Sequence, residues 1–149
     1  MSENSIITFK NILSKNGYRI TTARMSLFRT LLNSEALSLR EIFEKANSTI
    51  DRVSIYRNIE LFEKLHIVRR ITIGWKYKLE LSDIFIAHHH HLTCLGCSKI
   101  IDIVDESQVE QFIESISRSI SFTPLNHHFE IEGYCFDCVA NKNKVTTLE

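Results

Sequence analysis

Hydrophobic positions in the first part of the chain recur every three to four residues, which places apolar side chains on one face of a helix. The pattern forms two stripes. The first is expected to end at Gly17, and the second follows the N-cap candidates Thr21 and Thr22. The stripes consist of Phe9, Ile12 and Leu13, and of Met25, Leu27, Phe28, Leu31 and Leu32. Two helices are therefore predicted before residue 34.

Capping signals predict two further helices. Ser38 and Glu41 have the spacing of a capping box, and Ser48 or Asp51 can cap the next helix. The third helix would turn Leu39, Ile42 and Phe43 inward. The fourth has an apolar and a polar set of positions: Val53, Ile55, Tyr56, Ile59, Phe62 and Leu65 against Arg52, Arg57, Asn58, Glu60 and Lys64.

The period of the pattern then changes from that of a helix to that of a strand. β-Branched residues precede Gly74, and from Trp75 to Leu81 apolar residues alternate with charged ones, which predicts a β-hairpin. Short helices followed by a hairpin are typical of a winged helix, a variant of the helix-turn-helix. We expect this domain to span residues 1–82, with a hinge linker at 83–87.

The second half predicts a small domain over residues 88–149. Strands are expected at 88–93, 99–104 and 129–133, and an amphipathic helix at 107–120. One face of that helix would carry Val109, Phe112, Ile113, Ile116 and Ile120. The predicted fold class is α+β, an N-terminal winged-helix domain followed by a small α/β dimerisation domain.

Charge divides the chain in the same way as the patterning. The net charge is zero, but residues 1–82 hold 14 Lys/Arg against 8 Asp/Glu, whereas residues 83–149 hold 4 against 10. A basic half suits a polyanion such as double-stranded DNA. No apolar run approaches the ~18 residues that a membrane span needs, and no signal peptide is apparent, so we expect a cytoplasmic protein without a membrane partner.

Four cysteines form two Cys-x-x-Cys pairs, Cys94 with Cys97 and Cys135 with Cys138. Each pair can chelate through two sulfurs, and together they can complete the tetrahedral Cys₄ set of structural zinc. Redox dithiols and unrelated buried cysteines are the alternatives. In a cytoplasmic protein, metal binding is favoured over disulfides.

A run of four histidines, residues 88–91, directly precedes the first cysteine pair. On a strand, His88 and His90 would face one way, and His89 and His91 the other, so one run can supply two metal sites. His127 could add an imidazole, and Glu80, Asp102, Glu106 and Glu110 could add carboxylates. Mixed sets of this kind suit Fe(II), Mn(II) or Zn(II). A solvated polar strand is the simpler alternative.

These motifs together resemble the ferric uptake regulator family over about residues 9–138. The similar segments are Leu13–Thr21, Arg24, Ser54–Arg57, Glu80–Leu81, His88–Cys97, Lys99–Asp102, Asn126–His127 and Glu132–Cys138. The resemblance implies a homodimeric, metal-responsive regulator, usually a repressor that binds palindromic operators when metal is present. It does not imply an enzyme or a small-molecule substrate, and no His-Glu-x-x-His motif or nucleophile elbow is visible.

The resemblance also implies three sets of metal ligands. A structural zinc would be held by Cys94, Cys97, Cys135 and Cys138. A regulatory Fe(II) or Zn(II), with Mn(II) as a further candidate, would be held by Glu80, His89, His91 and Asp102. A second ion would be held by His88, His90, Glu110 and His127. For the second ion, the family's exact spacing falls on Val109 rather than Glu110. No histidine occurs in residues 34–38, where many iron-type members have one, so Glu35 or His66 would have to substitute.

By the same resemblance, residues 51–65 form the DNA-recognition helix. Its Ser54, Tyr56 and Arg57 would enter the major groove, and Lys15 and Arg19 would reach the backbone or the minor groove. Lys76 and Lys78 on the wing would add phosphate contacts. Zinc-uptake and peroxide-sensing members of the family remain alternatives to an iron regulator, and a metal-storage module or zinc hydrolase would leave the winged helix without a role.

Overall fold

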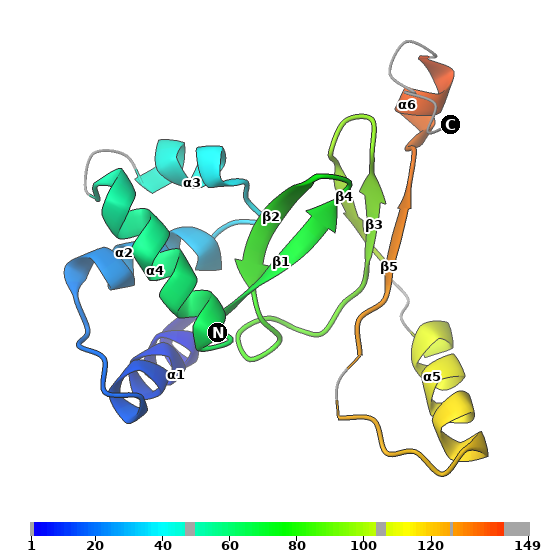
Figure 1. Ribbon diagram of the computed structural model, residues 1–149, viewed down its shortest axis with the longest axis horizontal. Coiled ribbons are helices and arrows are strands. Elements are labelled where there is room, and N and C mark those ends of the chain that lie inside the picture. Colours follow the sequence, from blue (N-terminus) through cyan, green and yellow to red (C-terminus); the bar gives the residue numbers. More distant parts are fainter. Residues whose placement is uncertain (1, 47–49, 104–106, 126, 142–149) are drawn as a thin grey trace. The chain divides into compact units, whose positions relative to one another are not determined.

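The computed structural model describes residues 2–46, 50–103, 107–125 and 127–141. The chain divides into two compact units, Met1–Ala87 and His88–Glu149 (Figure 1). Each unit contains both helices and strands, which confirms the α+β class. No helix within the described residues is long and apolar enough to cross a membrane.

The described residues of the first unit form four helices: α1 (Ser2–Lys15), α2 (Thr22–Leu32), α3 (Leu39–Ala46) and α4 (Arg52–Lys64). Two of the predicted N-caps are Thr21 and Asp51, whereas Thr22, the other candidate before α2, is the first residue of that helix. Thr21 accepts a hydrogen bond from the backbone N–H of Arg24 (3.3 Å), and Asp51 accepts one from Ser54 (2.9 Å). Ser48, the alternative cap for α4, lies outside the described residues.

The capping box at the start of α3 is formed in both directions. The backbone N–H of Ser38 donates to Glu41 Oε2 (2.7 Å), and the backbone N–H of Glu41 donates to Ser38 Oγ (3.3 Å). The Ser38 hydroxyl also donates to Glu41 Oε2 (2.7 Å), and this bond, with the one from the Ser38 backbone, holds the pKa of Glu41 below its ordinary value although burial opposes it. The start of α3 is therefore determined by local sequence.

An antiparallel hairpin follows α4 and forms the wing. Strands β1 (Val68–Ile73) and β2 (Lys76–Leu81) are joined by a turn in which Gly74 has a φ of 56°. That left-handed conformation favours glycine and suits a two-residue hairpin turn. Leu37 and Leu79 exchange backbone hydrogen bonds of 2.8 and 2.7 Å, which joins the segment before α3 to the hairpin. Together, the helices and hairpin make a winged helix.

The core of the first unit is aromatic at its centre. Phe9 and Phe28 stack with ring centroids 4.1 Å apart, and Phe62 packs edge-on to Phe9 at 5.3 Å. Phe85 is also buried, with its ring 5.0 Å from that of Phe28. The segment 83–87, expected to be a linker, therefore contributes a core residue to the first unit.

In the second unit, the part of the chain that the structure describes forms a three-stranded sheet and two helices. The elements are β3 (His91–Cys94), β4 (Ile100–Asp102), α5 (Ser107–Ser119), β5 (Glu130–Gly133) and α6 (Phe136–Ala140). In the strand order β4-β3-β5, β4 is antiparallel and β5 parallel to the central strand. Each strand is shorter than its predicted segment, and the short helix α6 was not predicted.

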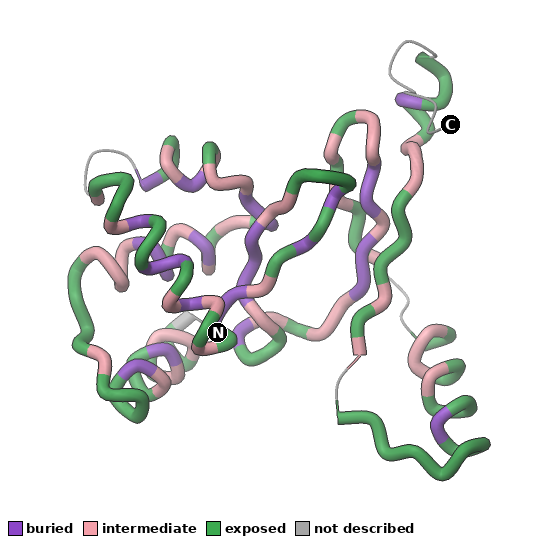
Figure 2. Tube along the Cα trace, viewed as in Figure 1, coloured by how far each residue is buried: buried purple, intermediate pink, exposed green. Residues whose placement is uncertain are grey.

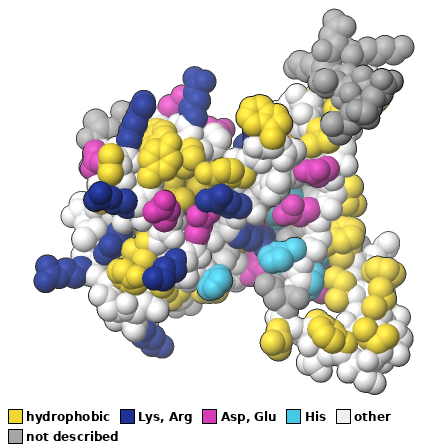
Figure 3. Space-filling model, viewed as in Figure 1, with side chains coloured by type: hydrophobic (Ala, Val, Ile, Leu, Met, Phe, Trp, Pro, Cys, Tyr) yellow, Lys and Arg dark blue, Asp and Glu magenta, His cyan; other side chains and the backbone are white. Residues whose placement is uncertain are grey.

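Helix α5 exposes much of its apolar face. The side chains of Phe112 and Ile116 in α5, and of Ile120 directly after it, are 63%, 46% and 67% exposed, and all three belong to the face predicted to be apolar. Figure 2 shows that most of this helix is exposed or half-buried, and Figure 3 shows hydrophobic side chains gathered over it. The pattern correctly identified one face, but a single chain does not cover that face.

Candidate metal centres and nucleic-acid interface

The two cysteine pairs meet because β3 and β5 are parallel neighbours. Cys94 ends β3 and is in register with Gly133 of β5, so the second pair follows directly beside the first. Cys135 is the N-cap of α6, and Cys138 lies within that helix. All four thiols are free of disulfides, and their sulfurs lie within 4.8 Å of one another.

The spacing and chemistry of the sulfurs fit a tetrahedral ion. Bonds of ~2.3 Å from zinc to sulfur place two sulfurs ~3.8 Å apart in a tetrahedron. The Sγ atoms of Cys97 and Cys135 are 3.8 Å apart. A Cys₄ zinc ion therefore fits these residues without rearrangement of the backbone.

Thiol ionisation in the cluster is uneven. Burial opposes ionisation of Cys94, but hydrogen bonds from the backbone, chiefly the N–H of Cys135 at 3.2 Å, lower its pKa to about 6. Burial and the neighbouring cysteines raise the pKa of the Cys138 thiol to about 12. The Cys94 thiolate is thus favoured at neutral pH, whereas a bound cation is required to ionise Cys138.

A second cluster consists of three imidazoles around one carboxylate. Glu110, in the first turn of α5, places its Oε1 3.4 Å from His88 Nε2, 3.1 Å from His90 Nε2 and 3.0 Å from His127 Nε2. The Nε2 atoms of His88 and His127 are themselves 3.1 Å apart. Metal bonds of ~2.0–2.1 Å in a tetrahedral site place ligand atoms ~3.3–3.4 Å apart, close to these values.

The carboxylate in this cluster is Glu110 and not its neighbour Val109, to which the family's exact spacing points. Burial would raise the pKa of Glu110, but its hydrogen bond with His90 and its interaction with His127 hold that pKa below the ordinary value. Glu110 is therefore ionised at neutral pH, as a metal ligand has to be. His90 is almost fully buried, with 2% of its surface exposed.

The four histidines alternate in direction as predicted. The rings of His88 and His90 are 4.8 Å apart, and those of His89 and His91 are 4.5 Å apart. Only His91 belongs to β3, so the alternation comes from extended backbone before the strand as well as from the strand itself. His91 Nε2 also lies 3.6 Å from Asp102 Oδ1, because the two residues are paired in the sheet.

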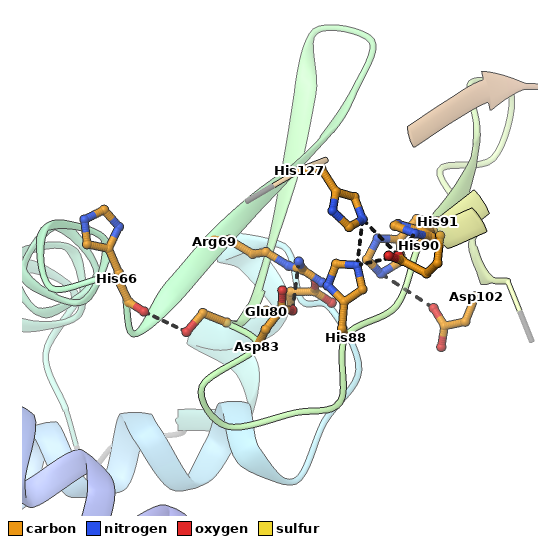
Figure 4. Close-up of polar contacts among 11 residues, drawn as sticks. His66, Arg69, Glu80, Asp83, His88, His90, His91, Asp102 and His127 are labelled. Carbon is orange, nitrogen blue, oxygen red and sulfur yellow. Dashed lines mark hydrogen bonds and ion pairs between the residues drawn. The ribbon is translucent and has the colours of Figure 1, made fainter. Parts of the chain in front are cut away.

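In the first unit, Glu80 is buried and paired with an arginine. Arg69 Nε lies 2.5 Å from Glu80 Oε1, and Arg69 Nη1 lies 3.0 Å from Asp83 Oδ1 (Figure 4). Arg69 was not singled out from the sequence. The hairpin turn could have revealed it, because pairing Ile73 with Lys76 also sets Arg69 opposite Glu80.

The two residues proposed to substitute for a missing histidine are exposed. Glu35 lies between α2 and α3, and His66 follows α4 with a φ of 53°. The backbone carbonyl of His66 accepts a hydrogen bond from Ser82 Oγ at 2.6 Å. Neither side chain is in a cluster with other potential ligands among the described residues of the first unit.

Helix α4 exposes residues suited to reading a DNA groove. Tyr56 is 48% exposed and packs edge-on against Phe43, with 5.3 Å between the ring centroids. Arg57 is exposed, and Ser54 is half-buried. Asn58, predicted to stay on the polar face, is instead buried, and it accepts a hydrogen bond from Arg24 Nε at 3.1 Å.

Basic side chains lie elsewhere on the surface of the first unit. Lys15 and Arg19 are exposed on either side of the turn between α1 and α2. On the wing, Lys76 is exposed with its Nζ 4.8 Å from the ring centroid of Trp75, and Lys78 is half-buried 3.9 Å from Glu41. Figure 3 shows several Lys and Arg side chains on one face of this unit. The cations are therefore available to a polyanion.

A winged helix joined to a small domain with clusters of thiols and imidazoles defines a metal-responsive, DNA-binding transcription regulator. The model of the ferric uptake regulator family matches residues 15–132. The chain belongs to this family. The ferric uptake regulation protein of Bacillus subtilis (strain 168) is 30% identical over 143 residues, which cover 91% of this chain and 95% of that protein.

Other relatives differ in the signal to which their names refer. The peroxide-responsive repressor PerR of Staphylococcus epidermidis is 30% identical over 139 residues, or 88% of each chain. The solved ferric uptake regulator of Helicobacter pylori has the same fold, with a TM-score of 0.79, 22% identity, and coverage of 93% of this chain and 94% of that chain. The solved ferric uptake regulator of Vibrio cholerae gives a TM-score of 0.70 at 26% identity, with coverage of 85% of this chain and 98% of that chain.

Proposed function

We propose that the protein is a homodimeric repressor of metal-homeostasis genes, which binds a palindromic DNA operator in the cytoplasm when Fe(II) or Zn(II) occupies a regulatory site. Mn(II) is a further candidate. Residues 1–82 would bind DNA, 83–87 would act as the hinge, and 88–149 would bind metal and dimerise. The observation that carries this proposal is the histidine run, which supplies two donor pairs pointing in opposite directions.

The regulatory ion would be bound by Glu80, His89, His91 and Asp102. These residues come from both units, so an ion among them would favour one orientation of the DNA-binding domain over others. A few kcal/mol of differential metal affinity would suffice for such a population shift. The support within the second unit is the approach of His91 to Asp102 and the pairing of the His89 and His91 rings.

The other two sites would support the second domain. Zinc held by the four cysteines would join the end of β3 to α6, since both cysteine pairs follow adjacent strands. The ion at His88, His90, Glu110 and His127 would attach α5 to the start of the sheet. The Helicobacter pylori regulator is described as having three functional metal binding sites, the same number as the ligand sets proposed for this chain.

Homodimerisation would cover the apolar face of α5. Phe112 and Ile116 of this helix and Ile120 directly after it are about half or more exposed, which is unusual on an isolated domain. A second copy of the chain provides the same surface, as a two-fold symmetric interface requires. Two recognition helices related by such symmetry would match a palindromic operator.

Metal-dependent DNA binding tests the function directly. A duplex would be selected from a random-sequence pool with metal-loaded protein, and its affinity would be measured by fluorescence anisotropy with and without metal. Arg57→Ala should weaken specific binding by about 1–3 kcal/mol, because the arginine would lose a groove or phosphate contact. Arg118→Ala, which removes an exposed arginine from the second unit, is the matched control. Equal affinity of Arg57→Ala and wild type would contradict the assignment of α4.

A peroxide-responsive repressor is the second candidate, favoured by the 30% identity to the Staphylococcus epidermidis protein. The same DNA assay separates the two. Hydrogen peroxide added to the Fe(II)-loaded protein should release DNA from a peroxide sensor and leave a pure metal sensor bound.

A further inference from the structure

We propose that Arg69 is an internal cation that competes with the regulatory metal for Glu80 and thereby sets the metal concentration at which the protein responds. The inference rests on the proposed role of Glu80 as a metal ligand. It assigns a function to a side chain that belongs to none of the three ligand sets.

Arg69 contacts the carboxylate of Glu80, the proposed metal ligand. Its Nε lies 2.5 Å from Glu80 Oε1, and the pair is well shielded, with side-chain exposures of 18% for Arg69 and 7% for Glu80. The contact is fixed by the sheet, since the two residues are partners in the register of β1 and β2. One of the two carboxylate oxygens is thus already occupied by a cation.

A second carboxylate holds the arginine in place. Arg69 Nη1 lies 3.0 Å from Asp83 Oδ1 in the segment after β2. The trio has one positive and two negative charges, so it keeps a net negative charge that attracts a further cation. The third nitrogen, Nη2, is buried without a hydrogen-bond partner, so the guanidinium is not fully satisfied where it stands.

The competition between the metal ion and Arg69 for Glu80 depends on their charges. A divalent ion brings two positive charges to Glu80, whereas Arg69 brings one, so the metal can displace the arginine or share the carboxylate with it. Either event weakens the charge-assisted hydrogen bond between Arg69 and Glu80. The free energy lost from that bond makes metal binding less favourable by the same amount. Asp83 can retain Arg69 when Glu80 turns to the metal. The ion pair therefore raises the metal threshold without leaving a buried charge unpaired in the metal-free protein.

The test compares Mn²⁺ affinities of full-length variants, measured from the EPR signal of free Mn²⁺. Arg69→Met should bind Mn²⁺ at the regulatory site about tenfold or more tightly, which is the scale of one hydrogen bond to a charged group. The metal-free form of the same variant should melt at a lower temperature. A merely structural arginine would lower stability without tightening metal binding, so the opposite directions of the two effects identify competition.

Arg70→Met is the matched control. Arg70 neighbours Arg69 on β1, but it pairs with Glu63 and lies over the Tyr77 ring, so its loss changes the charge equally without touching Glu80. Its Mn²⁺ affinity should equal that of wild type. Arg69→Lys should restore most of the wild-type affinity, and Arg69→Gln provides the same comparison should the methionine variant not fold.

Two results would overturn the inference, and they differ in what else they affect. If Glu80→Gln removes one Mn²⁺ binding step but folded Arg69→Met and Arg69→Gln bind Mn²⁺ as wild type does or more weakly, then Arg69 does not compete with the metal. The proposed regulatory ligand set would be unaffected by that result. If Glu80→Gln retains every step, the proposed regulatory ligand set is itself wrong, and the inference falls with it.

Discussion

Loss of metal from the cysteine cluster should unfold the second unit and leave the first unit folded. The reason is the distribution of buried apolar residues. The large buried cluster that includes Phe9, Phe28 and Phe85 belongs to the first unit. Among the described residues of the second unit, the buried hydrophobic side chains are those of Cys94 and Cys138. Structure in the second unit therefore depends on metal, on dimerisation, or on both.

The magnitudes favour metal as the largest single contribution. Each ordered residue costs roughly 1–2 kcal/mol of backbone entropy, and each buried apolar side chain returns about 1.5–3 kcal/mol. A structural zinc contributes about 10–16 kcal/mol in small domains. With so few buried apolar side chains, we expect β3, β5 and α6 to separate when the cysteines hold no zinc.

Cys97→Ser is the most informative variant, because Cys97 is exposed and its substitution leaves no cavity in a core. Zinc content would be measured by elemental analysis and local structure by hydrogen exchange with mass spectrometry. We expect loss of about one zinc ion per chain and loss of protection over residues 91–94 and 130–140, with the first unit unchanged. Ser115→Ala, an exposed change on α5, is the control.

Two outcomes would refute this reasoning. Full zinc content in Cys97→Ser would mean that the four sulfurs do not form one site. Loss of zinc with unchanged protection of β3 and β5 would mean that the sheet is stabilised by something other than the ion.

Two further predictions concern the histidine run and the dimer. His89→Ala/His91→Ala should abolish metal-dependent DNA binding yet leave a folded dimer with its cysteine-bound zinc. His88→Ala/His90→Ala should mainly lower thermal stability and remove one metal equivalent. Identical losses of DNA binding by the two double variants in anisotropy titrations would show that one site uses both pairs. Phe112→Asp should shift sedimentation from dimer to monomer, because an unpaired charge in an apolar interface costs about 2 kcal/mol or more; an intact dimer would exclude this face of α5.

Local signals made much of the first unit predictable. The reciprocal bonds of Ser38 and Glu41, the cap at Asp51 and the glycine in the hairpin turn each depend on residues a few positions apart. Asn58 escaped prediction because its burial depends on Arg24, which reaches it from another helix. Patterns along one element do not reveal such partners.

The second unit was less predictable for a different reason. Helix α6 is five residues long, which is too short for a helical period to be recognised. The choice of Glu110 over Val109 depends on where the side chain at the start of α5 points, and spacing along the chain does not determine this. The apolar face of α5 was recognised, but whether a single chain buries it is a property of assembly.

The histidine run also determines how the chain would respond to an in-frame deletion of one histidine codon. The pairing of β3 with its neighbours fixes the run at its His91 end. Loss of one codon would therefore draw Ala87 into the position of His88, while every later position would still hold a histidine. Such a deletion would therefore remove a ligand from the cluster around Glu110 and leave histidines at positions 89 and 91.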